Sequence, residues 1–180
     1  MSTTRISRHN KAPRPPVYRA LLDARAVAAW RVPDGMTSRV HEFDAREGGR
    51  FRVSLTYDAP TGAGTTSPNT DTYHGYFARL VPDEQVVEAV EFETADPALQ
   101  GEMRITTTLV DADGGTEIAV AYEGLPPGLP EDANEVGTRM ALAKLAALVE
   151  RNIDAWFAEL DRSANAPFME DGRHQPPMPE

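Results

Sequence analysis

The middle of the chain alternates apolar and polar residues with a period of two, as strands with one wet face do. This pattern is clearest between residues 51 and 57, where every second residue is apolar or aromatic: Phe51, Val53, Leu55 and Tyr57. Further strands are predicted in SRVHEFDA (38–45), YHGYFARLV (73–81), QVVEAVEFE (85–93), EMRITTTLV (102–110) and TEIAVAYE (116–123). Asp and Gly residues in DADGG (111–115) supply the positive φ angles of a hairpin turn between the last two.

The pattern changes to a helical spacing on both sides of these strands. RPPVYRALLDARAVAAW (14–30) predicts one or two short helices ending near Trp30. A helix of about 25 residues is predicted after GLPPGLPEDAN (124–134), with Asp132 or Asn134 as its N-cap. Its apolar stripe comprises Leu142, Leu145, Val149, Ile153, Trp156 and Leu160. Helices, then antiparallel strands, then one long helix indicate an α+β fold.

The two ends of the chain differ from the middle. Residues 161–180 are rich in proline and polar residues, and we predict a flexible tail there. The basic residues near the start are interpreted as a solvated segment that precedes the fold: Arg5, Arg8, Lys11 and Arg14. Residues 1–160 are therefore predicted to form one domain.

The adjacent glycines Gly48 and Gly49 admit two interpretations. A phosphate-binding loop would place them before a helix, with a lysine or a further glycine at a fixed spacing. Here the residues that follow are strand-like. We therefore predict a hairpin corner or bulge between 38–45 and 50–55, where a Cβ atom would not fit.

Charge and composition exclude several classes of function. The formal net charge is −10, which disfavours nucleic acid as a partner. The chain has no cysteine, no apolar run long enough to span a bilayer and no secretory signal in its first 30 residues, so we expect a cytoplasmic protein. The histidines lack metal-binding spacing, and the calcium-loop-like start at Asp111 has Tyr122 where a glutamate belongs. No metal and no cofactor are predicted.

Taken in order, several segments resemble the SRPBCC superfamily, in the bacterial branch similar to the C-terminal domain of the activator of Hsp90 ATPase. These segments are the helices ending at Trp30, FDAREGGRFRV, HGYFARLVPDEQVVEAVEF, DADGGTEIAV and NEVGTRMALAKLAALVE. The resemblance extends from about Ser7 to Glu150. One position departs from it, because relatives often carry a tryptophan directly after the glycine of the last segment, where this chain has Thr138.

The resemblance implies a START-like helix-grip fold. In this fold a curved antiparallel sheet of about six or seven strands wraps around a long C-terminal helix, and an apolar cavity lies between them. Three functions stay open: binding of a small hydrophobic molecule, a polyketide cyclase or aromatase-like enzyme, and a co-chaperone-like module that contacts a protein partner such as Hsp90. A homodimer is also left open, since sheet edges are available.

Candidate site residues follow from the expected inner faces. The expected ligand contacts are Trp30, Phe51, Val53, Phe92, Met103, Ile105, Tyr122 and Met140. For any one of them, simple core packing is the competing interpretation. No catalytic residue is assigned, but His74 and Tyr73 are candidates for proton transfer, against the alternative of a surface histidine. Glu91 and Glu93 are interpreted as the wet face of a strand rather than a hydrolase pair.

Overall fold

The computed structural model describes residues 3–59, 64, 66–151, 155, 158–159 and 161–162. Seven strands form one antiparallel sheet in the order β1-β7-β6-β5-β4-β3-β2. The strands are β1 (Thr3–Asn10), β2 (Met36–Phe43), β3 (Arg50–Tyr57), β4 (Thr70–Val81), β5 (Gln85–Phe92), β6 (Met103–Ala112) and β7 (Gly115–Glu123). The helices are α1 (Arg14–Leu21), α2 (Ala24–Trp30) and α3 (Glu131–Glu150).

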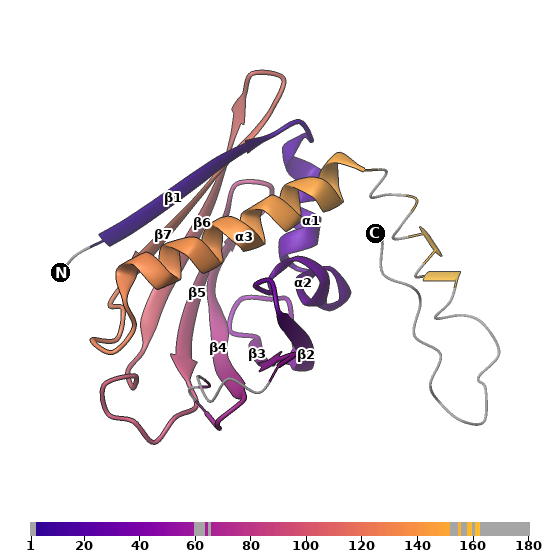
Figure 1. The fold of residues 1–180 in the computed structure, drawn as a ribbon. Helices are drawn as coiled ribbons and strands as arrows, with labels where there is room; N and C mark the ends of the chain where they lie inside the picture. The colour runs from indigo at the N-terminus through magenta and orange to yellow at the C-terminus, as the bar shows by residue number, and fades with distance from the viewer. Residues whose placement is uncertain are drawn as a thin grey trace.

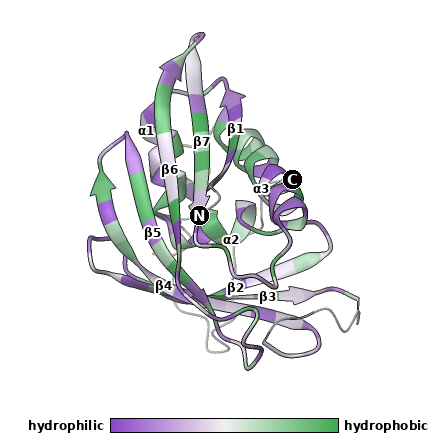
Figure 2. Cartoon of the chain, turned by 90° about the vertical axis from the view of Figure 1, so that its left-hand side faces the viewer, coloured by the Kyte–Doolittle hydropathy of each residue, from purple (hydrophilic) through white to green (hydrophobic). Residues whose placement is uncertain are grey.

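The sheet curls around α3, which lies on its inner side together with α1 and α2 (Figures 1 and 2). Each strand presents apolar side chains to this side, and the buried core joins them to α3 through residues such as Val53, Ile118 and Leu145. The α+β class and the helix-grip architecture are therefore confirmed, and the seven strands agree with the predicted six or seven.

The N-terminal segment corrects one prediction. It is the edge strand β1, which pairs antiparallel with β7 along its whole length, with Ile6 opposite Val120. Ile6 and Asn10 are buried, and the Asn10 side chain bonds the Thr116 carbonyl oxygen and the Ala12 amide. The interpretation as a solvated segment preceding the fold was wrong, because one apolar residue and one buried amide anchor this strand.

The predicted hairpin between β6 and β7 is confirmed. Its two central residues, Asp113 and Gly114, both have positive φ angles, of 47° and 74°. This combination is that of the tight turn whose twist matches the strands on either side. The turn fixes the register of the two strands, and so places Ile105 directly opposite Tyr122.

The glycine pair also has the predicted structural role. Gly48 has a φ of 77°, and its amide bonds the Phe77 carbonyl oxygen at 2.8 Å. A Cβ atom on Gly49 would overlap the carbonyl oxygen of Asp44. The pair therefore shapes the connection between β2 and β3 and brings it against β4.

Replacing Gly49 by alanine is expected to lower the free energy of unfolding by about 2 kcal/mol or more, because the backbone must shift to admit the methyl group. The matched control is Gly137→Ala in α3, where an added Cβ meets nothing within 4 Å. That variant is expected to gain about 0.5–1 kcal/mol from helix propensity. Urea unfolding measures both, and an unchanged midpoint for Gly49→Ala would refute the packing argument.

Helix α3 begins earlier than predicted, uses a different cap and ends at Glu150, after 20 residues rather than about 25. Its N-cap is Pro130, so Asp132 and Asn134 lie inside the helix and the predicted caps were wrong. Glu131 and Asp132 occupy the first turn, where negative charge suits the helix dipole. The stripe is buried at Leu142, Leu145 and Val149. Its predicted continuation, Ile153, Trp156 and Leu160, lies outside the described residues, as does most of the predicted tail.

Candidate ligand-binding cavity

A cavity of about 470 Å³ lies between the sheet and α3. Its walls come from the inner faces of β3 to β7, from the segment around α2 and the start of β2, and from the first half of α3. The backbone of α3 lies close to β1, α1 and α2. The helix thus rests on one side of the curved sheet, and its N-terminal half spans the space in front of the other strands.

Most of the cavity wall is apolar, and six of the eight expected contact residues line it: Trp30, Phe92, Met103, Ile105, Tyr122 and Met140. The Trp30 ring is fixed, because its Nε1 donates a hydrogen bond of 2.9 Å to the Ala20 carbonyl oxygen. Val136 also lines the cavity and is 53% exposed, which places an apolar side chain at its rim.

Phe51 and Val53, the other two expected contact residues, are buried but do not line this cavity. Phe51 belongs to an aromatic cluster, with its ring centroid 5.1 Å from that of Phe77 and 6.2 Å from that of Tyr73. Phe43 adds an edge-to-face contact with Phe77 at 5.5 Å. This cluster fills the inner side of the sheet near Phe51, so the residue serves packing there.

An ion pair that the sequence analysis did not identify lies in the cavity wall. Arg31 Nη1 is 2.6 Å from Glu88 Oε1, and the Glu88 side chain is only 8% exposed. The Arg31 guanidinium also sits over the Tyr73 ring, 5.6 Å from its centroid. A sequence signal for Glu88 existed, since it shares one face of β5 with Val86, Val90 and Phe92 and breaks an apolar row.

Tyr73 and Tyr122, two buried tyrosines in the wall, have hydroxyls that differ in their partners. The Tyr122 hydroxyl is 2.8 Å from Thr138 Oγ1, and Thr138 in turn donates to the Asn134 carbonyl oxygen. The Tyr73 hydroxyl is buried and has no hydrogen-bond partner within the described part of the chain, and the same holds for Asn134 Nδ2. Thr138, where the sequence departs from its resemblance, thus contributes a hydroxyl to the cavity.

The charge states of these groups follow from their surroundings. Burial raises the pKa of Tyr73; Arg31 opposes this rise, and Glu88 and Tyr122 add to it. The phenol is therefore protonated at neutral pH and can donate a hydrogen bond. Burial by itself lowers the pKa of Arg31, but Glu88, Tyr73 and Tyr122 together raise it by more, and the net shift is upward. Arg31 therefore carries its positive charge, with the Glu88 carboxylate 2.6 Å away.

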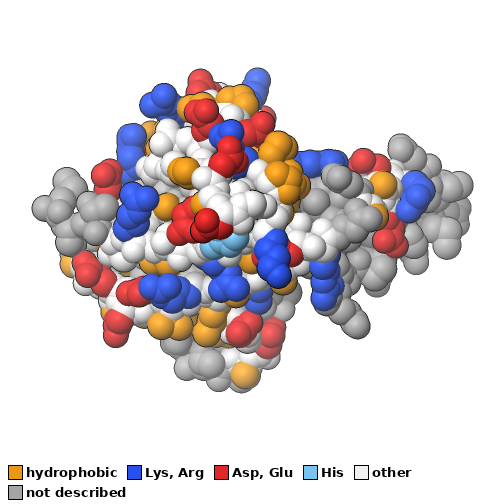
Figure 3. Space-filling view, turned by 90° about the horizontal axis from the view of Figure 1, so that it is seen from above, with side chains coloured by type: hydrophobic (Ala, Val, Ile, Leu, Met, Phe, Trp, Pro, Cys, Tyr) orange, Lys and Arg blue, Asp and Glu red, His pale blue; other side chains and the backbone are white. Residues whose placement is uncertain are grey.

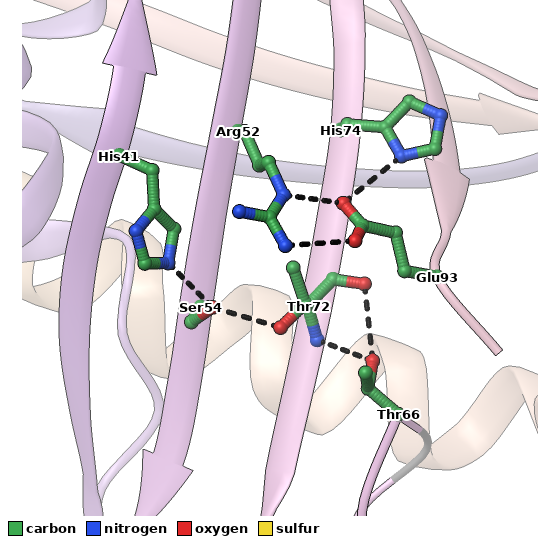
Figure 4. Close-up of polar contacts among 7 residues, drawn as sticks. All are labelled: His41, Arg52, Ser54, Thr66, Thr72, His74 and Glu93. Carbon is green, nitrogen blue, oxygen red and sulfur yellow. Dashed lines mark hydrogen bonds and ion pairs between the residues drawn. The ribbon is translucent and has the colours of Figure 1, made fainter.

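His74 lies on the opposite face of the sheet from Tyr73, its neighbour on β4. Its side chain points toward Glu93 (Figure 4). Its Nδ1 is 3.2 Å from Glu93 Oε2, and Arg52 donates two hydrogen bonds to the same carboxylate, at 2.8 and 2.9 Å. Nearby, His41 Nε2 is 2.8 Å from the Ser54 hydroxyl. The structure therefore separates the two candidates for proton transfer, and only Tyr73 of the two lines the cavity.

The outer cluster predicts a small pH dependence of stability. The hydrogen bond from Arg52 lowers the pKa of Glu93, burial opposes this, and His74 lowers it further. A carboxylate whose pKa is lower in the folded than in the unfolded chain stabilises the fold at pH values above its unfolded-state pKa of 4.5. This contribution is lost as the pH falls through the pKa of the folded state. Glu93→Gln is expected to lower the melting temperature slightly at pH 7, and by less at about pH 3.

The matched control for this prediction is Glu91→Gln, two residues away on the same outer face. It should leave the melting temperature unchanged at both pH values, because no described side chain pairs with Glu91. Thermal unfolding followed by circular dichroism measures both variants. An effect of Glu93→Gln that is as large at pH 3 as at pH 7 would contradict the assignment.

The surface outside the cavity shows no separation of charge on the face seen from above, where acidic and basic side chains are interspersed (Figure 3). None of the described helices has the length and apolar character needed to cross a membrane. Within the described ranges, no three His, Asp or Glu side chains are grouped so that they could hold a metal ion.

A curved sheet that wraps around a long helix, with an apolar cavity between them, is the architecture of helix-grip proteins. The chain belongs to the family of activator of Hsp90 ATPase homolog 1-like proteins, whose sequence profile matches residues 11–150. This match confirms the family inferred from the sequence segments. The chain matches none of the curated proteins.

Solved structures share the fold. Protein CV1439 from Chromobacterium violaceum is 32% identical with a TM-score of 0.74, over 84% of this chain and 100% of that chain. Mll3558 from Rhizobium loti is 28% identical with a TM-score of 0.65, over 81% and 95% of the two chains. DynU16, from the dynemicin biosynthetic locus, is 20% identical with a TM-score of 0.58, over 84% of this chain and 48% of that chain. The last likeness concerns the fold alone.

Proposed function

We propose that this protein binds one small, largely apolar molecule in the cavity between the sheet and α3. The observation that supports the proposal is the cavity itself. It offers about 470 Å³ of concave space against mostly apolar side chains, which is the form that small-molecule sites usually take. The volume lies within the range of known small-molecule sites.

The composition of the wall supports this function as well. Trp30, Phe92 and Met140 offer aromatic and flexible apolar surface, which suits a ligand with an apolar body. The exposed Val136 gives such a molecule an apolar surface at the rim. Burial of the ligand's apolar area against these side chains would supply most of the binding free energy.

A second candidate function is a cyclase- or aromatase-type reaction on a polyketide-like substrate. It is favoured by the Tyr73 hydroxyl and the Arg31–Glu88 pair in the wall, because Tyr73 would donate a hydrogen bond or a proton to a substrate carbonyl. The fold likeness to DynU16, from a biosynthetic locus, agrees with this candidate. Recovery of the bound molecule chemically unchanged after long incubation would favour binding over catalysis.

Titration with the neutral fluorophore N-phenylnaphthylamine tests the proposed binding. Its emission rises when it enters an apolar site, and we expect saturable binding of one molecule per chain. Glu91→Gln, on the outer face of the sheet, should bind the fluorophore like the unmodified protein. Emission that rises linearly without saturation would refute the proposal.

A further inference from the structure

The Tyr73 hydroxyl is the most unusual polar group in the cavity wall. Its residue is only 6% exposed, and no described atom accepts or donates a hydrogen bond to the hydroxyl. Buried polar groups without a partner are rare in folded proteins, because they lose their bonds to water and gain nothing in return. Phenylalanine would fill the same place without this cost, so the hydroxyl needs a partner that the described part of the chain does not supply.

The groups around this hydroxyl are rich in hydrogen-bond donors. The Arg31 guanidinium lies over the Tyr73 ring and has five N–H donors, of which Glu88 accepts one in the described part of the chain. The amide nitrogen of Asn134, also in the wall, has no described partner. A ligand that satisfies these groups must present an acceptor, which a simple cation such as an ammonium group lacks.

The charges in the wall argue against an anionic acceptor. Among the described residues that line the cavity, the acidic side chains are Asp34, Asp71 and Glu88, and the basic one is Arg31. Lys144 offsets Asp34, with its Nζ 3.1 Å from Asp34 Oδ1. Glu88 already neutralises Arg31 at 2.6 Å, so a ligand carboxylate beside Arg31 would also face Glu88. Desolvating that extra negative charge is costly, because Glu88 already offsets the charge of Arg31.

We infer that the ligand of this cavity is a neutral molecule with an apolar body and a carbonyl-type acceptor oxygen, which receives a hydrogen bond from Tyr73 beside Arg31. This inference rests on the proposed function, because it concerns the ligand of the same cavity. Burial keeps the Tyr73 phenol protonated, since its pKa is raised, and so keeps the hydroxyl available as a donor.

Three probes of nearly equal shape test the inference: acetylnaphthalene, isopropenylnaphthalene and naphthoic acid, substituted at the same ring position. They present a neutral carbonyl, a methylene group in its place, and a carboxylate at neutral pH. Competition against N-phenylnaphthylamine gives their affinities. We expect the ketone to bind about tenfold more tightly than the hydrocarbon, which is the usual value of one added hydrogen bond in a buried site. The carboxylate should bind most weakly.

Tyr73→Phe should remove this preference, so that ketone and hydrocarbon bind equally. The variant loses only an unpartnered hydroxyl, and its melting temperature should be unchanged or higher. Tyr76→Phe is the matched control, because Tyr76 lies on the outer side of the same strand and should keep the tenfold preference.

The outcomes separate the two proposals. Saturable binding of all three probes with equal affinities, or strongest binding of the carboxylate, would overturn the carbonyl inference and leave apolar binding intact. A preference for the ketone that survives Tyr73→Phe would overturn the role of Tyr73. Failure of the fluorophore and of every probe to bind would overturn the proposed function and, with it, this inference.

Discussion

Arg31→Met is expected to lower the free energy of unfolding by about 3 kcal/mol, which is the usual effect of removing one partner of a buried ion pair. The Glu88 carboxylate would remain in an apolar wall, 8% exposed, without its counter-ion. Methionine has a volume close to that of the arginine stem, so the loss reports mainly on charge. Urea unfolding at neutral pH measures the change.

The double variant Arg31→Met/Glu88→Leu separates charge from packing. With both charges gone, no ion is left unpaired, and we expect stability close to that of the unmodified protein, or above it. A double variant as unstable as Arg31→Met alone would show that the residues act through shape rather than charge. If the double variant recovers the stability of the unmodified protein, the Arg31–Glu88 pair is not needed for folding. This result would agree with a role of the pair in ligand binding.

Gly137→Phe is expected to weaken the binding of N-phenylnaphthylamine more than tenfold. Gly137 lines the cavity on α3, one turn after Ala133 and one turn before Ala141, which also line it. An added Cβ meets no atom within 4 Å, so the phenyl ring would occupy space that is now empty. Stability should be kept, because glycine is a poor helix former and the ring gains apolar contacts.

Gly137→Ala is the control for this variant. It improves helix propensity by more than phenylalanine does but adds only one methyl group, and should bind the fluorophore with nearly unchanged affinity. Fluorescence titration compares the variants, and thermal unfolding verifies that both are folded. Unchanged binding by a folded Gly137→Phe variant would place the fluorophore outside the cavity.

The strands and turns could be predicted because their signals are local. Residues 51–57 alternate cleanly, and Asp113 and Gly114 adopt the backbone angles that their residue types favour. The edge strand β1 could not be predicted in this way, since Ile6 is the one large apolar residue among its inward positions and Asn10 is buried through side-chain bonds. Its stability comes from pairing with β7, which lies more than a hundred residues away in sequence.

The polar part of the cavity was also beyond local reasoning. Arg31 and Glu88 are 57 residues apart, and only the folded sheet brings them together. The alternation along β4, by contrast, could have separated Tyr73 from His74, because neighbouring residues on a strand face opposite sides. The sequence resemblance predicted the cavity. The charged pair in its wall could be identified only from the three-dimensional structure.

Native mass spectrometry of the protein purified from its own cells tests ligand binding most directly. If the cavity holds a ligand, the spectrum will show one small neutral molecule bound per chain, and the molecule will contain a carbonyl group. Gly137→Phe, purified in the same way, will lack it. A spectrum of the bare chain alone, with no adduct formed after the fluorophore is added, would contradict ligand binding in this cavity.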